Sequence, residues 1–388
     1  MARAKLMVMS DAPTSSTGLG RITRELVQRI HANLSDTIEV CTFGYGGCES
    51  RHLPWRQYTI RRLENWIAPE LPVVWFDFAG NEPGYLLAIW NVGWVGYLSD
   101  PSTLPPSGLR DFLQANPFQR WTYSPIDADS VDGKLSGPIT EILNGFDRVL
   151  AYTEWAAKLV GNGTPHIPHG IDCSVFYPRD AKAVRQNFIE TVSGRQAKPI
   201  KENVAIIGIV ATNTSRKDWG LAFETCAELK RRGMNLGIWA HTDVFQKHWD
   251  LVSMANEFGL ANRVIFTNGF LSDEVMATAF SGCNITLGIG SGEGFGYPIF
   301  ESLAAGTPCI HGNYGGAAEF LPEEYKVEPI GFKWHGGPYN ARYPVFSAVD
   351  WADRVQAVLG TKASLPAELD WTNVWPQFKK WFLEGING

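Results

Sequence analysis

Apolar residues along the chain fall into two alternating patterns. Short runs of consecutive apolar residues are typical of strands buried in a parallel sheet, and they are separated by stretches in which apolar residues recur every three or four positions, as in amphipathic helices. The apolar runs are KLMVMS, TIEVCTF, PVVWF, YLLAIW, RWTYS and RVLAY, followed by NVAIIGIV, NLGIWAH, RVIFTN, NITLGIG and TPCIHG. The alternation predicts an α/β fold with mainly parallel sheets and helices on both faces of each sheet.

The runs form two sets, so we expect two doubly wound, Rossmann-like domains in the 388 residues. Residues 177–203 are polar, contain two prolines and lack a strand pattern, which predicts a linker. The N-terminal domain is then expected over residues 1–176 and the C-terminal domain over 204–370, with a last helix over 371–388 packing back on the first domain. The two sheets are expected to present their carboxyl ends across a cleft.

Composition narrows the class of protein. A net charge of -6 argues against a generally basic surface for nucleic acid or membranes. The six cysteines are scattered, which favours reduced thiols over a zinc site or a disulfide framework. No apolar run is long enough to span a membrane, and the first run meets Asp11 and Pro13 too early for a signal peptide. We therefore expect a cytoplasmic protein.

The most informative segment is SGEGFGYPIFESLAAGTPCI, which follows the predicted strand NITLGIG. Glu293 lies in its glycine-rich loop, and Pro298 is suited to the first turn of a helix that contains Glu301. Glycines let backbone amides approach a ligand, and a helix start offers N–H groups to a diphosphate. Glu301 could then accept hydrogen bonds from a ribose diol, and Glu293 could oppose positive charge on the anomeric carbon of a sugar. The alternative is a pair of glutamates around an ordinary loop.

Two cations, Arg216 and Lys217, follow the predicted strand NVAIIGIV. At the carboxyl end of that strand they could neutralise a departing diphosphate, although they could also simply decorate the start of a helix. No D-x-D motif is placed to hold a metal ion. The pattern therefore predicts stabilisation of the leaving group without a metal.

The combination EGFGYPIFE, AAGTPCI and NYGGAAEFL resembles the retaining family 4 of the glycosyltransferases, which have the two-domain GT-B fold. TGLGRITREL, AYTEWAAKLV, PHGIDCSVF and NTSRKDWGLAFE also look like segments of that family, so the resemblance covers most of the chain. It implies a hexosyl- or pentosyltransferase that uses a nucleotide-diphosphate sugar and no cofactor. It further implies that Glu293 acts on the donor sugar in catalysis. The donor-binding residues that it implies are Gly18, Gly20, Arg216, Lys217, Phe295, Gly296 and Glu301.

The acceptor is less well specified. Asp127 follows the predicted strand RWTYS, at a place where many relatives carry a histidine. It could orient or deprotonate the acceptor hydroxyl, or it could merely cap a turn. Asp129, two residues later, is the alternative candidate for the same role. Arg61 and Arg62 lie among aromatic residues, and with Trp94 they are candidate acceptor contacts. This stretch is typical of binding to phosphate or nucleobases, or of a solvated loop. A glycan, a protein hydroxyl and a modified nucleobase in DNA all remain candidate acceptors.

Retention without an obvious nucleophile favours front-face attack, with double displacement as the alternative. Two rival functions stay open. A nucleotide-sugar epimerase or hydrolase would share the fold without using an acceptor, and a catalytically silent protein would only bind the nucleotide sugar.

Overall fold

The computed structural model describes residues 3–47, 53–161, 163–244, 248–335 and 340–388. The chain divides into two compact units. The first comprises Met1–His169, His335–Ala341 and Trp375–Gly388, and the second comprises Gly170–Trp334 and Arg342–Val374. The chain therefore leaves the first unit at Gly170 and completes it with its last residues.

The first unit is built on a six-stranded parallel sheet with the order β3-β2-β1-β4-β5-β6. Its strands are β1 (Ala4–Asp11), β2 (Ile38–Tyr45), β3 (Arg56–Thr59), β4 (Gly84–Ile89), β5 (Phe118–Tyr123) and β6 (Arg148–Leu150). Its helices are α1 (Gly18–Leu34), α2 (Leu71–Ala79), α3 (Gly96–Ser99), α4 (Gly108–Gln114), α5 (Gly137–Asn144) and α6 (Glu154–Val160). The order reverses direction between β1 and β4, which defines the switch point of a doubly wound sheet.

The apolar run PVVWF, expected as a strand, lies in α2. Leu71, Trp75 and Phe78 are buried while Val73 and Phe76 are 73% and 64% exposed, so burial follows the spacing of a helix. Both faces of the segment are apolar, which is why its composition imitates a buried strand.

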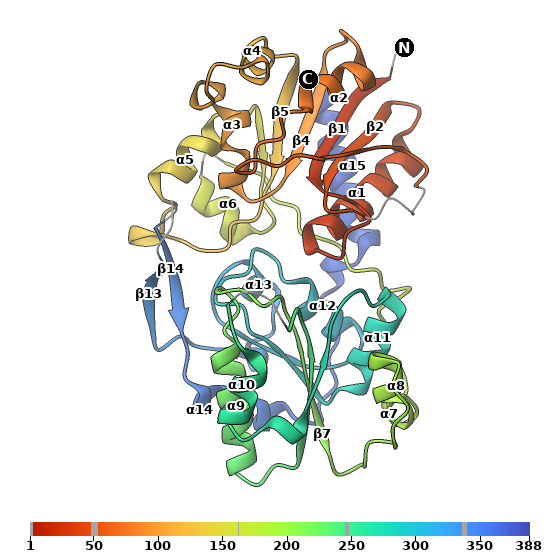
Figure 1. The fold of residues 1–388 in the computed structure, drawn as a ribbon, viewed down its shortest axis with the longest axis vertical. Coiled ribbons are helices and arrows are strands. Elements are labelled where there is room, and N and C mark those ends of the chain that lie inside the picture. Colours follow the sequence, from red (N-terminus) through yellow and green to blue (C-terminus); the bar gives the residue numbers. More distant parts are fainter. Residues whose placement is uncertain (1–2, 48–52, 162, 245–247, 336–339) are drawn as a thin grey trace. The chain divides into compact units, whose positions relative to one another are not determined.

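The helix α15 (Trp371–Asn387) packs against the sheet of the first unit from Trp375 onward. Trp381 meets Trp121 of β5 edge to face with 5.0 Å between ring centroids, and Arg148 of β6 donates to the Trp381 carbonyl at 2.9 Å. A Cβ on Gly385 would lie only 1.7 Å from the Arg148 guanidinium, so the helix approaches the sheet as closely as glycine permits. Figure 1 shows α15, in blue, beside the sheet that begins with β1, in red.

The second unit repeats this topology, with the order β12-β11-β10-β7-β8-β9. The strands are β7 (Ala205–Val210), β8 (Leu236–His241), β9 (Val264–Thr267), β10 (Ile285–Gly288), β11 (Cys309–Gly312) and β12 (Lys326–Val327), and β13 (Gly331–His335) pairs with β14 (Ala341–Val345) in a separate two-stranded sheet. The helices are α7 (Ala181–Gln186), α8 (Phe188–Ser193), α9 (Trp219–Arg231), α10 (Leu251–Glu257), α11 (Asp273–Gly282), α12 (Tyr297–Ala304), α13 (Gly316–Phe320) and α14 (Ala348–Val358). The six-stranded sheet is parallel, and its switch point lies between β7 and β10.

Residues 177–203, expected as a linker, contain α7 and α8 and belong to the second unit. Phe188 is 1% exposed and meets Trp239 of β8 edge to face, and Val192 is also buried. Phe188 and Val192 anchor α8, whereas α7 has no buried residue and is held by Arg185, which donates to the Gly282 carbonyl at 2.9 Å. So few buried apolar residues leave no clear periodicity in the sequence.

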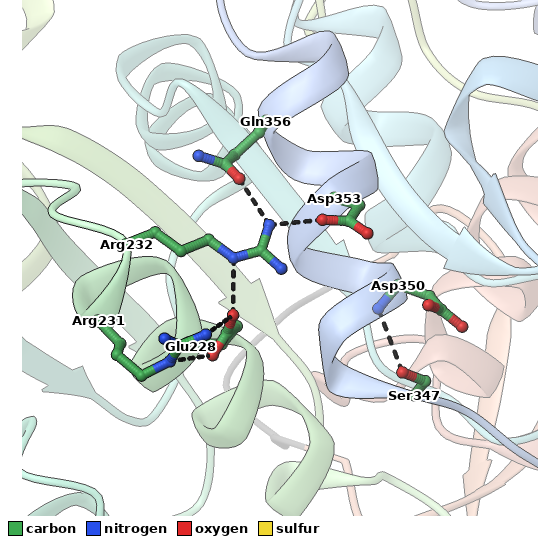
Figure 2. A network of polar contacts seen from close by, with 7 residues as sticks. All are labelled: Glu228, Arg231, Arg232, Ser347, Asp350, Asp353 and Gln356. Carbon is green, nitrogen blue, oxygen red and sulfur yellow. Dashed lines mark hydrogen bonds and ion pairs between the residues drawn. The ribbon is translucent and has the colours of Figure 1, made fainter.

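Polar contacts join α9 to α14 on the surface of the second unit, as Figure 2 shows. Arg232 at the end of α9 donates to Glu228 of α9 at 2.7 Å and to Asp353 and Gln356 of α14 at 2.5 and 2.6 Å. This guanidinium bonds both helices at once and so ties the end of α9 to α14.

Each unit contains a buried histidine whose protonation should govern its stability in acid. Burial lowers the pKa of His169 to about 3 and that of His311 to about 4, from an ordinary 6.5. Below pH 6.5 the unfolded chain binds protons that the folded chain refuses, so stability is present at neutral pH and falls as the pH approaches 4. One pKa unit corresponds to about 1.4 kcal/mol, and we expect each histidine to cost a few kcal/mol at pH 4.

Urea denaturation between pH 7 and pH 4.5 measures this effect. The substitution His311→Leu should flatten the dependence of the free energy of unfolding on pH, whereas His248→Leu, at an exposed position, should leave it as in the wild type. Equal slopes for all three proteins would show that His311 is not the titrating group.

Candidate active site

Two loops meet at the switch point of the second unit. The loop after β7 and the loop after β10 are joined by backbone hydrogen bonds from Asp218 N to Ile289 O at 2.9 Å and from Ser291 N to Arg216 O at 3.0 Å, with a bridge between Lys217 and Gly290. This short pairing places the cations of the first loop beside Glu293 in the second.

Glu293 is the centre of a compact ion cluster. Lys217 donates to Oε1 of the carboxylate, and Arg216 Nη1 lies 3.3 Å from Oε2. Arg216 also donates to the carbonyl of Gly292. The side chains of Glu293 and Lys217 are each only 12% exposed, so little water screens their attraction and the pair is stronger than one on the surface.

The glycines around Glu293 make room for this arrangement. A Cβ on Gly290 would lie 2.0 Å from Oε1 of Glu293, so the carboxylate occupies the space of the missing side chain. The Glu293 carbonyl accepts hydrogen bonds from Gly316 and Ala317 at 2.9 and 3.3 Å, where α13 begins. Gly296 precedes α12 with a φ of 87°, a conformation that glycine adopts without strain.

Glu301 and Phe295 are both buried, in α12 and in the loop that precedes it. Glu301 is 2% exposed and is the fifth residue of α12, just past its first turn, because the helix begins at Tyr297 and has Pro298 as its second residue. The Phe295 ring is 3% exposed and packs on Phe300 with 4.7 Å between centroids. A donor contact by Phe295 would therefore use its backbone.

His311 is a residue that the sequence analysis did not single out. It is 1% exposed on β11, and its Nδ1 donates to the carbonyl of Gly288, the last residue of β10. Its Nε2 has no hydrogen-bond partner among the residues that the structure describes. Burial is the main cause of the lowered pKa of His311, and the positive charge of the Lys217 ammonium lowers it further. The imidazole therefore lies within electrostatic range of the ion cluster. The sequence feature that could have indicated His311 is its place as a polar residue inside the otherwise apolar run TPCIHG.

The remaining predicted donor and catalytic residues lie in the first unit. Thr17 caps α1 by accepting from Gly20 N at 3.0 Å, and a Cβ on Gly20 would lie 2.0 Å from Ser15 Oγ, so close packing alone requires glycine there. Gly18 is exposed at the start of the same helix. Asp127, half-buried, and Asp129, buried, both follow β5.

Of the predicted acceptor contacts, Arg61 and Arg62 are exposed and Trp94 is half-buried. The Trp94 ring stacks on that of Trp66 with 3.6 Å between centroids and 3° between planes.

Neither a metal cage nor a membrane helix is seen in the part of the chain that the structure describes. No group of three or more histidine, cysteine, aspartate or glutamate residues there could hold a metal ion. None of the helices within the described ranges is long and apolar enough to cross a bilayer.

The segment that carries the ion cluster has known relatives. Residues 193–328 match the family model of glycosyl transferases, group 1. This range contains Arg216, Lys217, Glu293 and Glu301. Over 167 residues, 40% of the chain, the sequence is 28% identical to the GDP-mannose-dependent alpha-(1-6)-phosphatidylinositol monomannoside mannosyltransferase of Mycolicibacterium smegmatis, and the matched part spans 39% of that relative.

Solved structures resemble the chain over nearly its whole length. Sucrose-phosphate synthase from Thermosynechococcus elongatus has a TM-score of 0.70 at 17% identity, covering 99% of this chain and 100% of that one. HepE from Anabaena, in complex with UDP and glucose, has a TM-score of 0.64 at 14% identity, covering 92% and 90%. These likenesses confirm the predicted two-domain α/β fold of the GT-B class. Together with the family match they support a glycosyltransferase.

Proposed function

We propose that the protein is a retaining, metal-independent glycosyltransferase that moves a sugar from a nucleotide-diphosphate sugar to a hydroxyl acceptor. The observation that carries the proposal is the Arg216–Lys217–Glu293 cluster at the switch point of the unit that matches the glycosyl transferase model. Ligands of doubly wound sheets bind at such a point.

The cluster contains the charges that this reaction needs. As the bond between the anomeric carbon and the diphosphate oxygen breaks, negative charge grows on the diphosphate and positive charge on the sugar. Arg216 and Lys217 can stabilise the first and Glu293 the second. The acceptor oxygen then bonds to the anomeric carbon on the same face, and its proton passes to a phosphate oxygen.

Binding of the donor requires an exchange of partners. Both cations contact Glu293, so an incoming diphosphate must compete with this carboxylate for Arg216 and Lys217. This exchange would release the Glu293 carboxylate from Arg216 and Lys217 when the donor binds, and the carboxylate could then interact with the donor sugar. Glu301 and the backbone of Phe295 and Gly296 complete the proposed donor site of the second unit, and Gly18 and Gly20 of the first unit stay candidate donor contacts.

The names of the similar proteins favour a uridine or guanosine nucleotide in the donor, since one relative is GDP-mannose-dependent and one structure holds UDP. We propose that the acceptor hydroxyl is engaged by the first unit, where Asp127 is the candidate to orient or deprotonate it and Arg61, Arg62 and Trp94 are candidate contacts. A glycan, a protein and a modified nucleobase are the classes to compare.

Nucleotide binding without metal is the direct test. UDP or GDP is expected to raise the melting temperature in metal-free buffer, and ligand at 100 times its dissociation constant stabilises a protein by about 2.7 kcal/mol. Because two side-chain cations neutralise the diphosphate, EDTA should leave the increase unchanged. An increase that appears only with magnesium or manganese would contradict the metal-free site.

Incubation with the donor alone distinguishes the rival functions. Full-rate hydrolysis or epimerisation of the nucleotide sugar without an acceptor would favour an epimerase or hydrolase, and nucleotide binding with no turnover in any acceptor panel would favour a silent binding protein.

A further inference from the structure

The first unit has a switch point of its own, between β1 and β4, with polar and aromatic residues gathered at it. β1 ends at Asp11, and β4 is followed by Trp90. The Asp11 carboxylate accepts a hydrogen bond from Trp90 Nε1 at 2.9 Å and one from the Thr17 hydroxyl at 2.5 Å. The carboxylate is thus fixed in place where ligands of such sheets bind.

Two further tryptophans flank this point. Trp94 packs against the hydrophobic core, and the half-buried ring of Trp66 stacks on it in parallel at 3.6 Å. Trp90 meets Trp66 edge-on at 6.4 Å and 75°, so the three indoles brace one another. Trp66 and Trp94 are both half-buried whereas Trp90 is completely buried, so the accessible part of this group belongs to the stacked pair.

The backbone holds Trp66 in a conformation that favours glycine. Glu64 and Ile67 exchange backbone hydrogen bonds of 3.1 and 2.9 Å around a two-residue turn. In that turn Asn65 has a φ of 50° and Trp66 a φ of 68°. Asn-Gly is the preferred pair for such a turn, and a bulky residue there is strained. Backbone strain of this kind is concentrated at ligand-binding sites, where the function of the side chain compensates for the strained backbone.

We propose that Trp66, supported by Trp94, is a stacking platform for a sugar ring of the acceptor, with Asp11 accepting a hydrogen bond from one of its hydroxyls. The C–H face of a sugar ring packs on a flat indole, and an anchored carboxylate is a strong acceptor for a hydroxyl. The inference rests on the proposed function and identifies the acceptor class as a carbohydrate.

Charge favours a neutral sugar over a nucleic acid. The Asp11 carboxylate would repel a phosphate backbone. Residues 56–77 carry three arginines and three carboxylates, so the stretch has no surplus positive charge. Arg56 is engaged by Asp77 at 3.6 Å, and a Glu70 oxygen accepts from the Arg62 backbone N–H at 3.0 Å.

The test uses the full chain and a panel of methyl pyranosides and disaccharides as probes. Trp66→Gly removes the indole and creates the favoured Asn-Gly turn, so we expect a folded protein in which the relief of backbone strain offsets part of the lost stacking on Trp94. Quenching of tryptophan fluorescence by the best glycoside should need about tenfold more ligand in this variant, and Trp66→Tyr should restore most of the affinity. Trp334→Ala, at a position 58% exposed in the second unit, is the matched control and should bind like the wild type.

The outcomes separate this proposal from the proposed function. Stabilisation by UDP or GDP that persists in Trp66→Gly while glycoside binding is weakened would support the platform. Glycoside binding that is equal in wild type and Trp66→Gly, or that is absent from the wild type, would overturn it even if nucleotide binding is intact. Quenching by nucleosides or oligonucleotides with none by glycosides would replace the carbohydrate with a nucleobase. If the wild-type protein binds glycosides but neither UDP nor GDP, only the transferase assignment is overturned.

Discussion

Replacement of Glu293 by glutamine is expected to lower kcat by about 100-fold or more while the dissociation constant of the donor nucleotide changes little. The substitution keeps the size of the side chain and removes its charge. The lost charge matters most when the anomeric carbon is positive, which is in the transition state and not in the bound donor. Donor binding should not weaken, since the diphosphate no longer competes with a carboxylate for Arg216 and Lys217.

Kinetics with saturating donor, together with calorimetric titration of UDP and GDP, measure the two quantities separately. Glu324→Gln, on the exposed surface of the same unit, is the control and should behave as the wild type. Glu301→Ala should show the opposite pattern, with weaker donor binding and a smaller loss of kcat. A Glu293→Gln protein that folds and turns over at the normal rate would remove Glu293 from the active site.

The substitution Lys217→Met should cost both activity and stability. Without its ammonium the departing diphosphate loses one of two cations, and we expect kcat/KM to fall by about 1,000-fold. Glu293, 12% exposed, would also lose a close partner and remain charged in a poorly hydrated site. Leaving a carboxylate in that state costs about 1 to 3 kcal/mol of unfolding free energy.

The double variant Lys217→Met/Glu293→Gln tests the coupling of the two side chains. Urea denaturation should show most of the lost stability regained, because the unpaired charge is gone, whereas kcat/KM should stay low. A double variant as unstable as Lys217→Met would show that the two groups do not interact in solution.

The architecture was largely predictable because burial in parallel sheets leaves continuous apolar runs, which both units contain. The errors come from segments in which burial does not follow that rule. The helix α2 is apolar on both faces, so its sequence predicts a buried strand where the structure has a helix. The segment containing α7 and α8 buries too few apolar residues for its helices to be predicted from periodicity.

The pairing of Arg216 and Lys217 with Glu293 could be anticipated, since the carboxyl ends of β7 and β10 share one edge of a sheet. The contribution of His311 could not, because it depends on which strand lies next to β10. The proximity of Asp11, Trp66 and Trp90 likewise depends on the strand order and on a turn with positive φ. Neither can be predicted from the local spacing of apolar residues. The place of Glu301 in α12 could be predicted only to within one residue, because Pro298 can be either the first or the second residue of a helix.

The packing of α15 on β5 and β6 has a consequence for how the protein is made. Trp121 and Arg148 emerge from the ribosome about 230 to 260 residues before Trp381 of the helix that covers them, a delay on the order of ten to fifty seconds at ordinary rates of translation. During that interval the second unit, nearly continuous in sequence, can fold while the first still exposes an aromatic strip along one side of its sheet. The nascent chain should therefore be most open to chaperones and to aggregation through its earliest-synthesised half, until the last turns of α15 reach Arg148.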